Sequence, residues 1–131
     1  MENTGKAYAA IKTIDDLVVY KLAFEAAMDI FEISKKFPPE EKYSLTDQIR
    51  RSSRSVAINI REGFAKKIYV KIFHRLCTDA AGSSEETRGW LKFALACKYL
   101  DDTTYSVVDK KYDRINAMLF TMTRNWVAYD A

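Results

Sequence analysis

Residues 103–126 read TTYSVVDKKYDRINAMLFTMTRNW. Large apolar side chains recur in this segment at alternating steps of three and four residues: Tyr105, Val108, Tyr112, Ile115, Leu119, Met122 and Trp126. This spacing places them on one face of an α-helix. The Asp101–Asp102 pair before the segment suits a helix start, because carboxylates accept hydrogen bonds from the free backbone N–H groups there. The pattern predicts a helix over about residues 102–126 with one face to bury.

A second stripe of this kind lies near the start of the chain. It follows Asp15–Asp16 and consists of Leu17, Tyr20, Phe24, Ala27 and Phe31. Pro38 and Pro39 come next, and two adjacent prolines stop a helix because neither donates a backbone hydrogen bond and the first restrains the residue before it. We therefore predict a helix over about residues 15–37 that buries this stripe.

The segment at about residues 44–62 also has signals for both ends of a helix. Ser44 can cap the start, and Asp47 three residues later completes a pair similar to a capping box. Gly63 can adopt the left-handed conformation that closes helices. Along this helix the apolar residues Leu45, Ile49, Val56 and Ile60 share one face, whereas Arg50, Arg54 and Arg61 share another, with Arg51 on its flank. The arginines therefore need not be buried.

A further helix is predicted at about residues 67–99. Its helical spacing includes Tyr69, Phe73, Leu76, Ala80, Thr87, Leu91, Ala94 and Lys98. The middle of this helix reads AAGSS at residues 80–84, although glycine costs about 1 kcal/mol relative to alanine inside a helix. Small side chains there would allow a neighbouring helix to approach closely.

Length and composition agree with a compact helical protein. The chain has 131 residues, of which 48% are hydrophobic and 30% charged, with four glycines and two prolines. These values indicate one folded domain over residues 1–131 with long helices. Four apolar faces joined by short connections predict an all-α fold, an antiparallel up-down-up-down four-helix bundle.

The sequence gives no sign of a membrane span or an oxidising compartment. It contains no run of about 18 apolar residues, and its start lacks the apolar stretch of a signal peptide, so we expect a cytoplasmic protein. Cys77 and Cys97 are twenty positions apart in one predicted helix, about 30 Å along its axis, which rules out a disulfide in that helix. We expect both to be small buried residues.

Positive charge is concentrated in one part of the chain. Residues 48–75 contain a single acidic residue, Glu62, and eight basic ones: Arg50, Arg51, Arg54, Arg61, Lys66, Lys67, Lys71 and Arg75. The rest of the chain holds more acidic than basic residues, so the net charge of +3 conceals a polarised molecule. A clustered positive field attracts polyanions, which indicates a nucleic-acid-binding surface made of these eight residues.

A simpler explanation of the basic cluster remains open. Arginines on a bundle are often only solvated, and Arg50 or Arg54 could pair with Glu85 or Glu86 of a neighbouring helix or subunit. Ile58 projects near the arginines and is either a subunit contact or an exposed apolar residue.

Aromatic residues near the basic cluster could add base stacking to phosphate binding. Tyr69 and Phe73 fall on the predicted apolar stripe of their helix and are expected in the core. Phe64 is the aromatic residue whose position the pattern determines least.

The residues needed for catalysis or metal binding do not occur in recognisable patterns. The only histidine, His74, has Lys71 three positions before it, so the Glu-x-x-His pairs of di-iron bundles are absent. Glu85 and Glu86 are adjacent and project about 100° apart on a helix, so they do not form an acid pair. The scattered glycines form no phosphate-binding loop. We therefore predict a protein that is not an enzyme and has no cofactor or metal.

Several of these segments together resemble a known family. They are YSLTDQIRRSSRSVAINIREG at residues 43–63, Phe37–Pro38 before it, and AAGSSE at residues 80–85. Taken in their order along the chain, these three segments resemble the four-helix-bundle family of 23S rRNA intervening-sequence proteins. That family is related to the accessory proteins of diversity-generating retroelements. Arg61 stands where that family usually has a small alanine.

The resemblance implies a bacterial bundle that assembles as a ring-like homo-oligomer, plausibly a pentamer, and that associates with structured RNA or another nucleic acid. By position, the basic segment of that family corresponds to Arg50, Arg51 and Arg54 in this chain. The resemblance also leaves an alternative function open, a structural protein–protein adaptor such as an accessory subunit of a reverse transcriptase.

Overall fold

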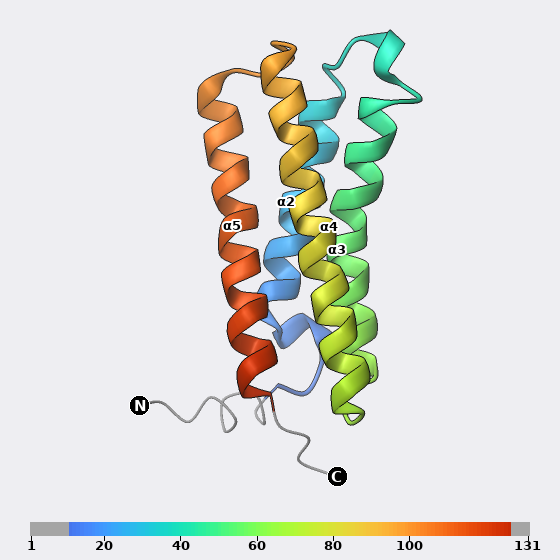
Figure 1. Cartoon of the computed structure of the whole chain (residues 1–131), viewed down its shortest axis with the longest axis vertical. Coiled ribbons are helices and arrows are strands. Elements are labelled where there is room, and N and C mark those ends of the chain that lie inside the picture. The colour runs from blue at the N-terminus through green and yellow to red at the C-terminus, as the bar shows by residue number, and fades with distance from the viewer. Residues whose placement is uncertain (1–10, 127–131) are drawn as a thin grey trace.

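The computed structural model describes residues 11–126, and four α-helices make up most of this range (Figure 1). The helices are α2 (Val18–Ser34), α3 (Leu45–Ala65), α4 (Val70–Ala96) and α5 (Asp102–Asn125). Two 3₁₀ turns, η1 (Ile14–Asp16) and η2 (Pro39–Glu41), precede α2 and α3. No strand occurs within residues 11–126, so the predicted all-α fold with four helices is confirmed.

Each helix packs against two others, so the four enclose one core. Helix α3 contacts α2 and α4, and α5 contacts α4 and α2. Figure 1 shows the α2–α3 and α4–α5 connections at one end of the molecule and the α3–α4 connection at the other. Across the described range, no helix has the length and apolar character needed to cross a membrane.

The predicted apolar face of α5 is confirmed. Val108, Tyr112, Ile115, Leu119 and Met122 are all buried. Trp126, just past the helix end, stacks on Phe73 of α4 with ring centroids 4.4 Å apart. Because each turn of α5 from Val108 to Met122 contributes a large buried side chain, this helix closes the core along most of its length.

The face of α3 that was predicted to be apolar is also buried, and its contact with α4 is close. Gly63 was predicted to end the helix, but α3 continues through it to Ala65. A β-carbon at Gly63 would lie 3.3 Å from the β-carbon of Leu76. The glycine therefore serves the contact between the two helices, and its role as a terminator was wrong.

The prediction for α2 was wrong about which face is buried. The buried positions are Val19, Ala23, Ala26, Ile30 and Ser34. Of the predicted stripe, Leu17 is buried, but Phe24 is 53% exposed and the other three members are only partly buried. Small alanines allow α2 to approach the core closely, which leaves the larger aromatic rings at the edge of the helix.

The helix ends differ from the prediction in detail. Asp101 caps α5 as expected, since its Oδ1 accepts a hydrogen bond from the backbone N–H of Thr104 at 2.7 Å. Ser44 precedes α3 but makes no capping hydrogen bond with its side chain. Glu41 caps instead, accepting from the N–H of Leu45 at 3.2 Å and from the hydroxyl of Ser44 at 2.6 Å. The predicted pair of Ser44 with Asp47 was therefore wrong.

The α4–α5 connection contains a residue with left-handed backbone geometry. Lys98 was expected inside the helix, but α4 ends at Ala96 and Lys98 has a φ of 64°. The N–H of Tyr99 donates to the carbonyl of Ala94 at 2.9 Å, and that of Lys98 to Leu95 at 2.9 Å. These two bonds form a Schellman motif, in which glycine is the usual residue at the position of Lys98.

The two cysteines are both free thiols but lie in different environments. Cys77 is buried, and burial raises the pKa of its thiol to about 11. Cys97 is exposed at the end of α4, so the expectation that both are buried was wrong for Cys97.

Candidate nucleic-acid interface

The eight basic residues predicted as a nucleic-acid site occupy several places on α3, α4 and the turn between them. Arg50, Arg54 and Arg61 line the side of α3 that faces α2, and we call these three residues the arginine row. Arg51 lies on another flank of α3. Lys66, Lys67, Lys71 and Arg75 surround the α3–α4 connection.

Two members of the arginine row, Arg50 and Arg54, lie over Phe31 of α2. The guanidinium carbons of Arg50 and Arg54 are 4.9 Å and 5.9 Å from the centre of the Phe31 ring. Arg50 also donates a hydrogen bond from Nε to the hydroxyl of Ser34 at 2.8 Å. The ring attracts both cations through its electron-rich face, so their positions are set without a carboxylate.

Arg61 is held in the same way at the other end of the row. Its Nη1 donates to the hydroxyl of Tyr20 at 3.1 Å, and its guanidinium carbon lies 5.6 Å from the Tyr20 ring. Arg61 therefore places a positioned cation beside α2. Arg54 and Arg61 are exposed and Arg50 is partly buried, so these cations lie at the surface.

Within residues 11–126, no salt bridge joins a member of the arginine row to a carboxylate. The carboxylates suggested as alternative partners have other contacts in the same chain. Glu85 pairs with Arg88 at 2.9 Å, and Glu86 accepts a hydrogen bond from the indole of Trp90 at 3.0 Å. Pairing of the row with these residues inside one chain was therefore wrong.

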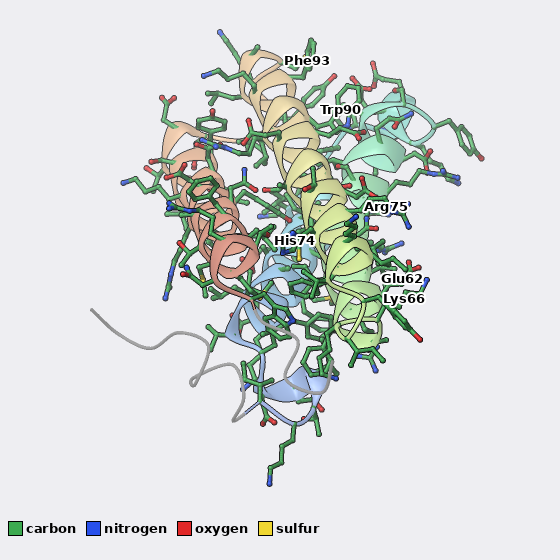
Figure 2. The ribbon with its side chains drawn as sticks, turned by 60° about the horizontal axis from the view of Figure 1, so that its bottom comes forward. Glu62, Lys66, His74, Arg75, Trp90 and Phe93 are labelled. Atoms are coloured by element: carbon green, nitrogen blue, oxygen red, sulfur yellow. The ribbon has the colours of Figure 1, made fainter. Side chains whose placement is uncertain are left out.

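The other predicted site residues include two that are paired. Arg51 lies 3.3 Å from Asp47, and Lys66 lies 2.9 Å from Glu62. The hydrogen bond from Lys66 lowers the pKa of the Glu62 carboxyl, and Arg75 adds to this effect. Figure 2 shows Glu62, Lys66 and Arg75 on the same side of the molecule. The one acidic residue of the basic region thus neutralises part of its charge.

Lys67 and Lys71 complete the predicted set. The ammonium group of Lys67 lies 4.4 Å from the centre of the Phe64 ring. Lys71 is exposed in the first turn of α4. The eight residues are therefore brought together as two groups, the arginine row beside α2 and a looser group around the α3–α4 turn, with Arg51 apart from both.

The aromatic residues near the basic surface are not the ones expected. Phe73 is buried as predicted, and Phe64 is buried too, whereas Tyr69, also predicted in the core, is 60% exposed. The rings that contact the arginine row belong to Tyr20 and Phe31, which the sequence pattern assigned to the core. Their position could have been inferred from Ala23 and Ala26. These small residues mark the face of α2 that packs against the core, so the rings of Tyr20 and Phe31 lie beside that face.

The residues considered for catalysis do not converge. His74 is partly buried beside Phe73, and its Nε2 has no hydrogen-bond partner in the described part of the chain. Figure 2 shows His74 on the far side of α4 from Glu62 and Lys66. Residues 11–126 contain no group of three or more His, Cys, Asp or Glu residues that could hold a metal ion.

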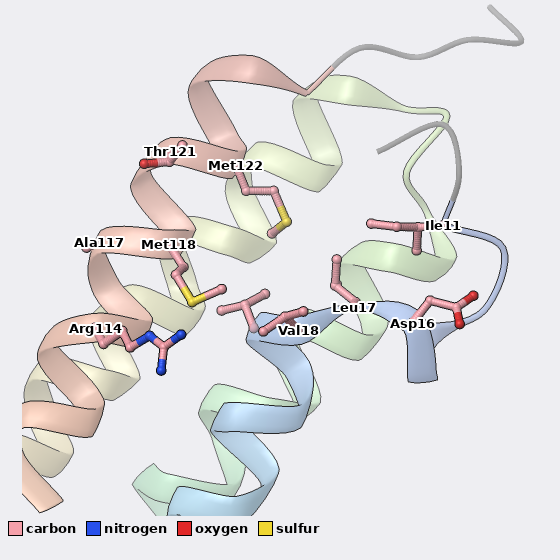
Figure 3. A pocket seen from close by; sticks show the side chains of 10 residues that line it. Ile11, Asp16, Leu17, Val18, Arg114, Ala117, Met118, Thr121 and Met122 are labelled. Atoms are coloured by element: carbon pink, nitrogen blue, oxygen red, sulfur yellow. The ribbon is translucent and has the colours of Figure 1, made fainter. Parts of the chain in front are cut away.

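An apolar pocket of about 390 Å³ opens between α2 and α5 (Figure 3). Val18, Met118 and Met122 contribute to its wall, and the guanidinium group of Arg114 lies at one side. Its lining residues come from α5 and the region before and at the start of α2, so the arginine row of α3 takes no part in it.

Comparison with known proteins identifies relatives by sequence and by fold. The profile of the 23S rRNA-intervening sequence protein family matches residues 15–121. A crystal structure described as a protein with unknown function from the S23 ribosomal protein family of Bacteroides thetaiotaomicron VPI-5482 has a similar fold, with a TM-score of 0.72. It is 24% identical and covers 81% of this chain and 98% of its own. No curated protein matches the sequence.

Proposed function

The chain belongs to the 23S rRNA-intervening sequence protein family, and from this premise we propose that it is a non-enzymatic protein that binds structured RNA or another nucleic acid through the basic surface of α3 and α4. The observation that carries the proposal is the arginine row. Three guanidinium groups lie in line, held by aromatic rings and hydroxyls instead of carboxylates. Their positive charge therefore remains available to phosphate groups.

Each group of basic residues has a role in this proposal. The arginine row contacts phosphates along one stretch of backbone, because an arginine fork can donate two hydrogen bonds to one phosphate. Lys66, Lys67, Lys71 and Arg75 extend the positive surface around the α3–α4 turn, and Arg51 adds to it on the adjoining flank of α3. Contacts of this kind fix position on the nucleic acid but do not read its sequence.

Oligomerisation forms a second part of the proposal. We infer a single domain over residues 1–131 with up-down-up-down helices, assembled as a ring-like homo-oligomer, a pentamer by family resemblance. Contacts of α2 residues Ser34 and Tyr20 with Arg50 and Arg61 support opposite directions for α2 and α3. In a ring, copies of the arginine row would bind one polyanion together, so weak contacts add up to useful avidity. A cytoplasmic location fits a partner of this kind.

Titration of a labelled structured RNA at increasing salt concentration tests the proposal. We expect the affinity to fall steeply with salt, and the double variant Arg50→Glu, Arg54→Glu to lose binding at least tenfold, because two phosphate contacts become repulsive. The matched control is Arg114→Glu, Arg124→Glu on α5, where Arg124 also lies over an aromatic ring, 5.4 Å from the centre of Phe120.

Equal losses in the two double variants would show only a general effect of net charge. Wild-type affinity in the Arg50→Glu, Arg54→Glu variant would remove the arginine row from the site. Circular dichroism of both variants must match that of the wild type for either result to count.

A protein–protein adaptor is the second candidate function, for example an accessory subunit of a reverse transcriptase. Large apolar side chains away from the arginine row favour it: Phe93 is 60% exposed on α4, and Val107 and Phe120 are 52% and 64% exposed on α5. Exposed apolar groups of this size are typical of protein contacts. A neighbouring reverse-transcriptase gene would favour the adaptor, and an insertion inside a ribosomal RNA gene would favour RNA binding.

A further inference from the structure

We propose that the face shared by α2 and α3 binds unpaired nucleotides, so that the preferred ligand is single-stranded RNA, such as a loop or bulge, and not a continuous duplex. This inference rests on the proposed function and deepens it. Its basis is a set of exposed apolar side chains placed between the positioned cations of the arginine row. We call Phe24, Met28 and Ile58 the apolar strip.

The members of the apolar strip are all well exposed. Phe24 is 53% exposed, Met28 46% and Ile58 57%. Ile58 comes four residues after Arg54 and three before Arg61, so it lies between them on one side of α3. Two of the three apolar side chains are on α2 and one is on α3, so the strip spans both helices.

Contacts at the two ends of the arginine row fix how α2 and α3 lie against each other. Arg50 bonds to Ser34, and Arg61 bonds to Tyr20. Phe24 and Met28 lie between Tyr20 and Ser34 on α2, so they lie at the level of α3 residues 54–58. The apolar strip is therefore flanked by cations at both ends.

The aromatic ring of Phe24 is available for stacking. Its centroid is 6.3 Å from that of Tyr20, with the two planes tilted by 45°. Tyr20 and Phe31 each lie against guanidinium groups of the row, whereas no cation within residues 11–126 lies over Phe24. Phe24 is thus the exposed aromatic ring of this face that could accept a base.

The positive charge of the face suits a polyanionic strand and disfavours a basic protein segment. The row itself has no carboxylate partner within the described residues. Of the acidic residues on α2, Asp29 pairs with Lys111 and Glu32 pairs with Lys35, and Glu25 is exposed. The positive charge of Arg50, Arg54 and Arg61 runs in a line along α3, and exposed apolar side chains lie beside it.

The arginine row and the apolar strip together favour an unpaired strand over a duplex. A duplex presents phosphates on the outside and keeps its bases stacked inside, so it would cover Phe24, Met28 and Ile58 without filling their apolar surface. An unpaired strand can place its phosphates on the arginines and turn its bases onto Phe24 and the neighbouring apolar side chains. The guanidinium groups also offer flat surfaces for stacking.

Fluorescence anisotropy with two forms of one labelled RNA tests this inference. The probes are an unstructured 12-nucleotide RNA and the same strand annealed to its complement, at fixed salt. We expect the single strand to bind about tenfold or more tightly, and Phe24→Ala to remove most of that preference, because loss of one base–aromatic stack lowers affinity about tenfold. Phe24→Tyr should retain the preference, and Phe24→Leu should not.

The control variant is Phe120→Ala on α5. Phe120 is exposed to a similar degree and also neighbours an arginine, Arg124, but it lies on a different helix. We expect this variant to bind both probes like the wild type. A parallel loss in Phe24→Ala and Phe120→Ala would overturn the assignment of stacking to α2 and α3.

The outcomes separate this inference from the proposed function. Equal binding of the two probes, with Arg54→Glu still weakening both, would overturn the preference for unpaired nucleotides and leave phosphate binding intact. Wild-type binding by Arg54→Glu would overturn the proposed function as well. A change in the molecular mass of Phe24→Ala in light scattering would identify the apolar strip as a contact between copies of the chain and overturn the inference.

Discussion

Two arginines show how differently one side-chain type is used in this molecule. Arg88 on α4 donates from Nε to Asp109 at 2.9 Å and from Nη1 to Glu85 at 2.9 Å. The hydrogen bond with Asp109, reinforced by Glu85, raises the pKa of Arg88 above its ordinary value. Arg54, by contrast, lies over Phe31. Arg88 therefore links α4 to α5, whereas Arg54 has no carboxylate partner within residues 11–126.

The positive φ angle of Lys98 leads to a prediction about stability. Lys98 holds a left-handed conformation in the Schellman motif after α4, which costs a residue with a β-carbon about 1 kcal/mol or more. We expect Lys98→Gly to raise the free energy of unfolding by roughly 0.5–1 kcal/mol, after the larger entropy of glycine in the unfolded chain is included. Urea denaturation measures this change.

The control for Lys98→Gly is Lys110→Gly, an exposed position inside α5. Glycine there should lower the free energy of unfolding by about 1 kcal/mol, because ordinary helical geometry disfavours it. If both variants lose stability to the same extent, the left-handed geometry at Lys98 carries no appreciable cost.

Among the helices, the contact between α3 and α4 depends on small groups. Gly63 faces Leu76, and Ser55 and Ser83 share a hydrogen bond of 2.9 Å across the same interface. Ser84, fully buried on α4, packs against α5 instead, where its hydroxyl donates to the backbone carbonyl of Tyr112 at 3.4 Å. The expectation that residues 80–84 allow close packing therefore holds for Ser83 and Ser84. It does not hold for Gly82, around which a β-carbon would meet nothing within 4 Å.

Two glycine variants should therefore have opposite effects on stability. Gly63→Ala places a methyl group 3.3 Å from the β-carbon of Leu76, which cannot move without its helix, so we expect a loss of roughly 1 kcal/mol. Gly82→Ala improves helix propensity without a clash, so we expect a gain of up to about 1 kcal/mol. Thermal and urea unfolding compare them. Equal gains in both variants would show that α3 and α4 separate easily at Gly63.

Helix positions and most buried faces could be predicted from the sequence, because periodic apolar residues, Asp101 and the Pro38–Pro39 pair are local signals. The periodicity of large apolar side chains alone predicted the wrong buried face for α2. Periodicity finds the large side chains Phe24 and Phe31, but burial followed the alanines that allow close approach. The same error hid the aromatic side of the candidate site, since rings assigned to the core were not considered as partners of Arg54.

At the scale of the whole molecule, exposed apolar residues occur on every helix. Besides Phe24 and Ile58 of the apolar strip, Phe93 on α4 and Val107 on α5 are each more than half exposed. The two outside the strip, Phe93 and Val107, are available for contacts between copies of the chain. Of these positions, periodicity assigned only Phe24 to the core. It does not distinguish a face buried between chains from one buried within a chain, because both have the same spacing.

Assembly is therefore predicted at this scale. Size-exclusion chromatography with light scattering should give a mass several times that of the 15.1 kDa chain. The assembled form should persist at raised salt if apolar contacts hold it, since these are not screened as charges are. A mass of one chain across working concentrations would contradict the ring and the avidity argument together.

The unequal placement of the two thiols gives direct experimental access to such an assembly. Cys97 is exposed, whereas Cys77 is buried with a thiol that resists deprotonation at neutral pH. The chain has no other cysteine. A maleimide spin label should therefore attach to one position per chain without mutagenesis. Pulsed electron resonance would then report the spacings between labels, and in a closed ring those spacings count the subunits.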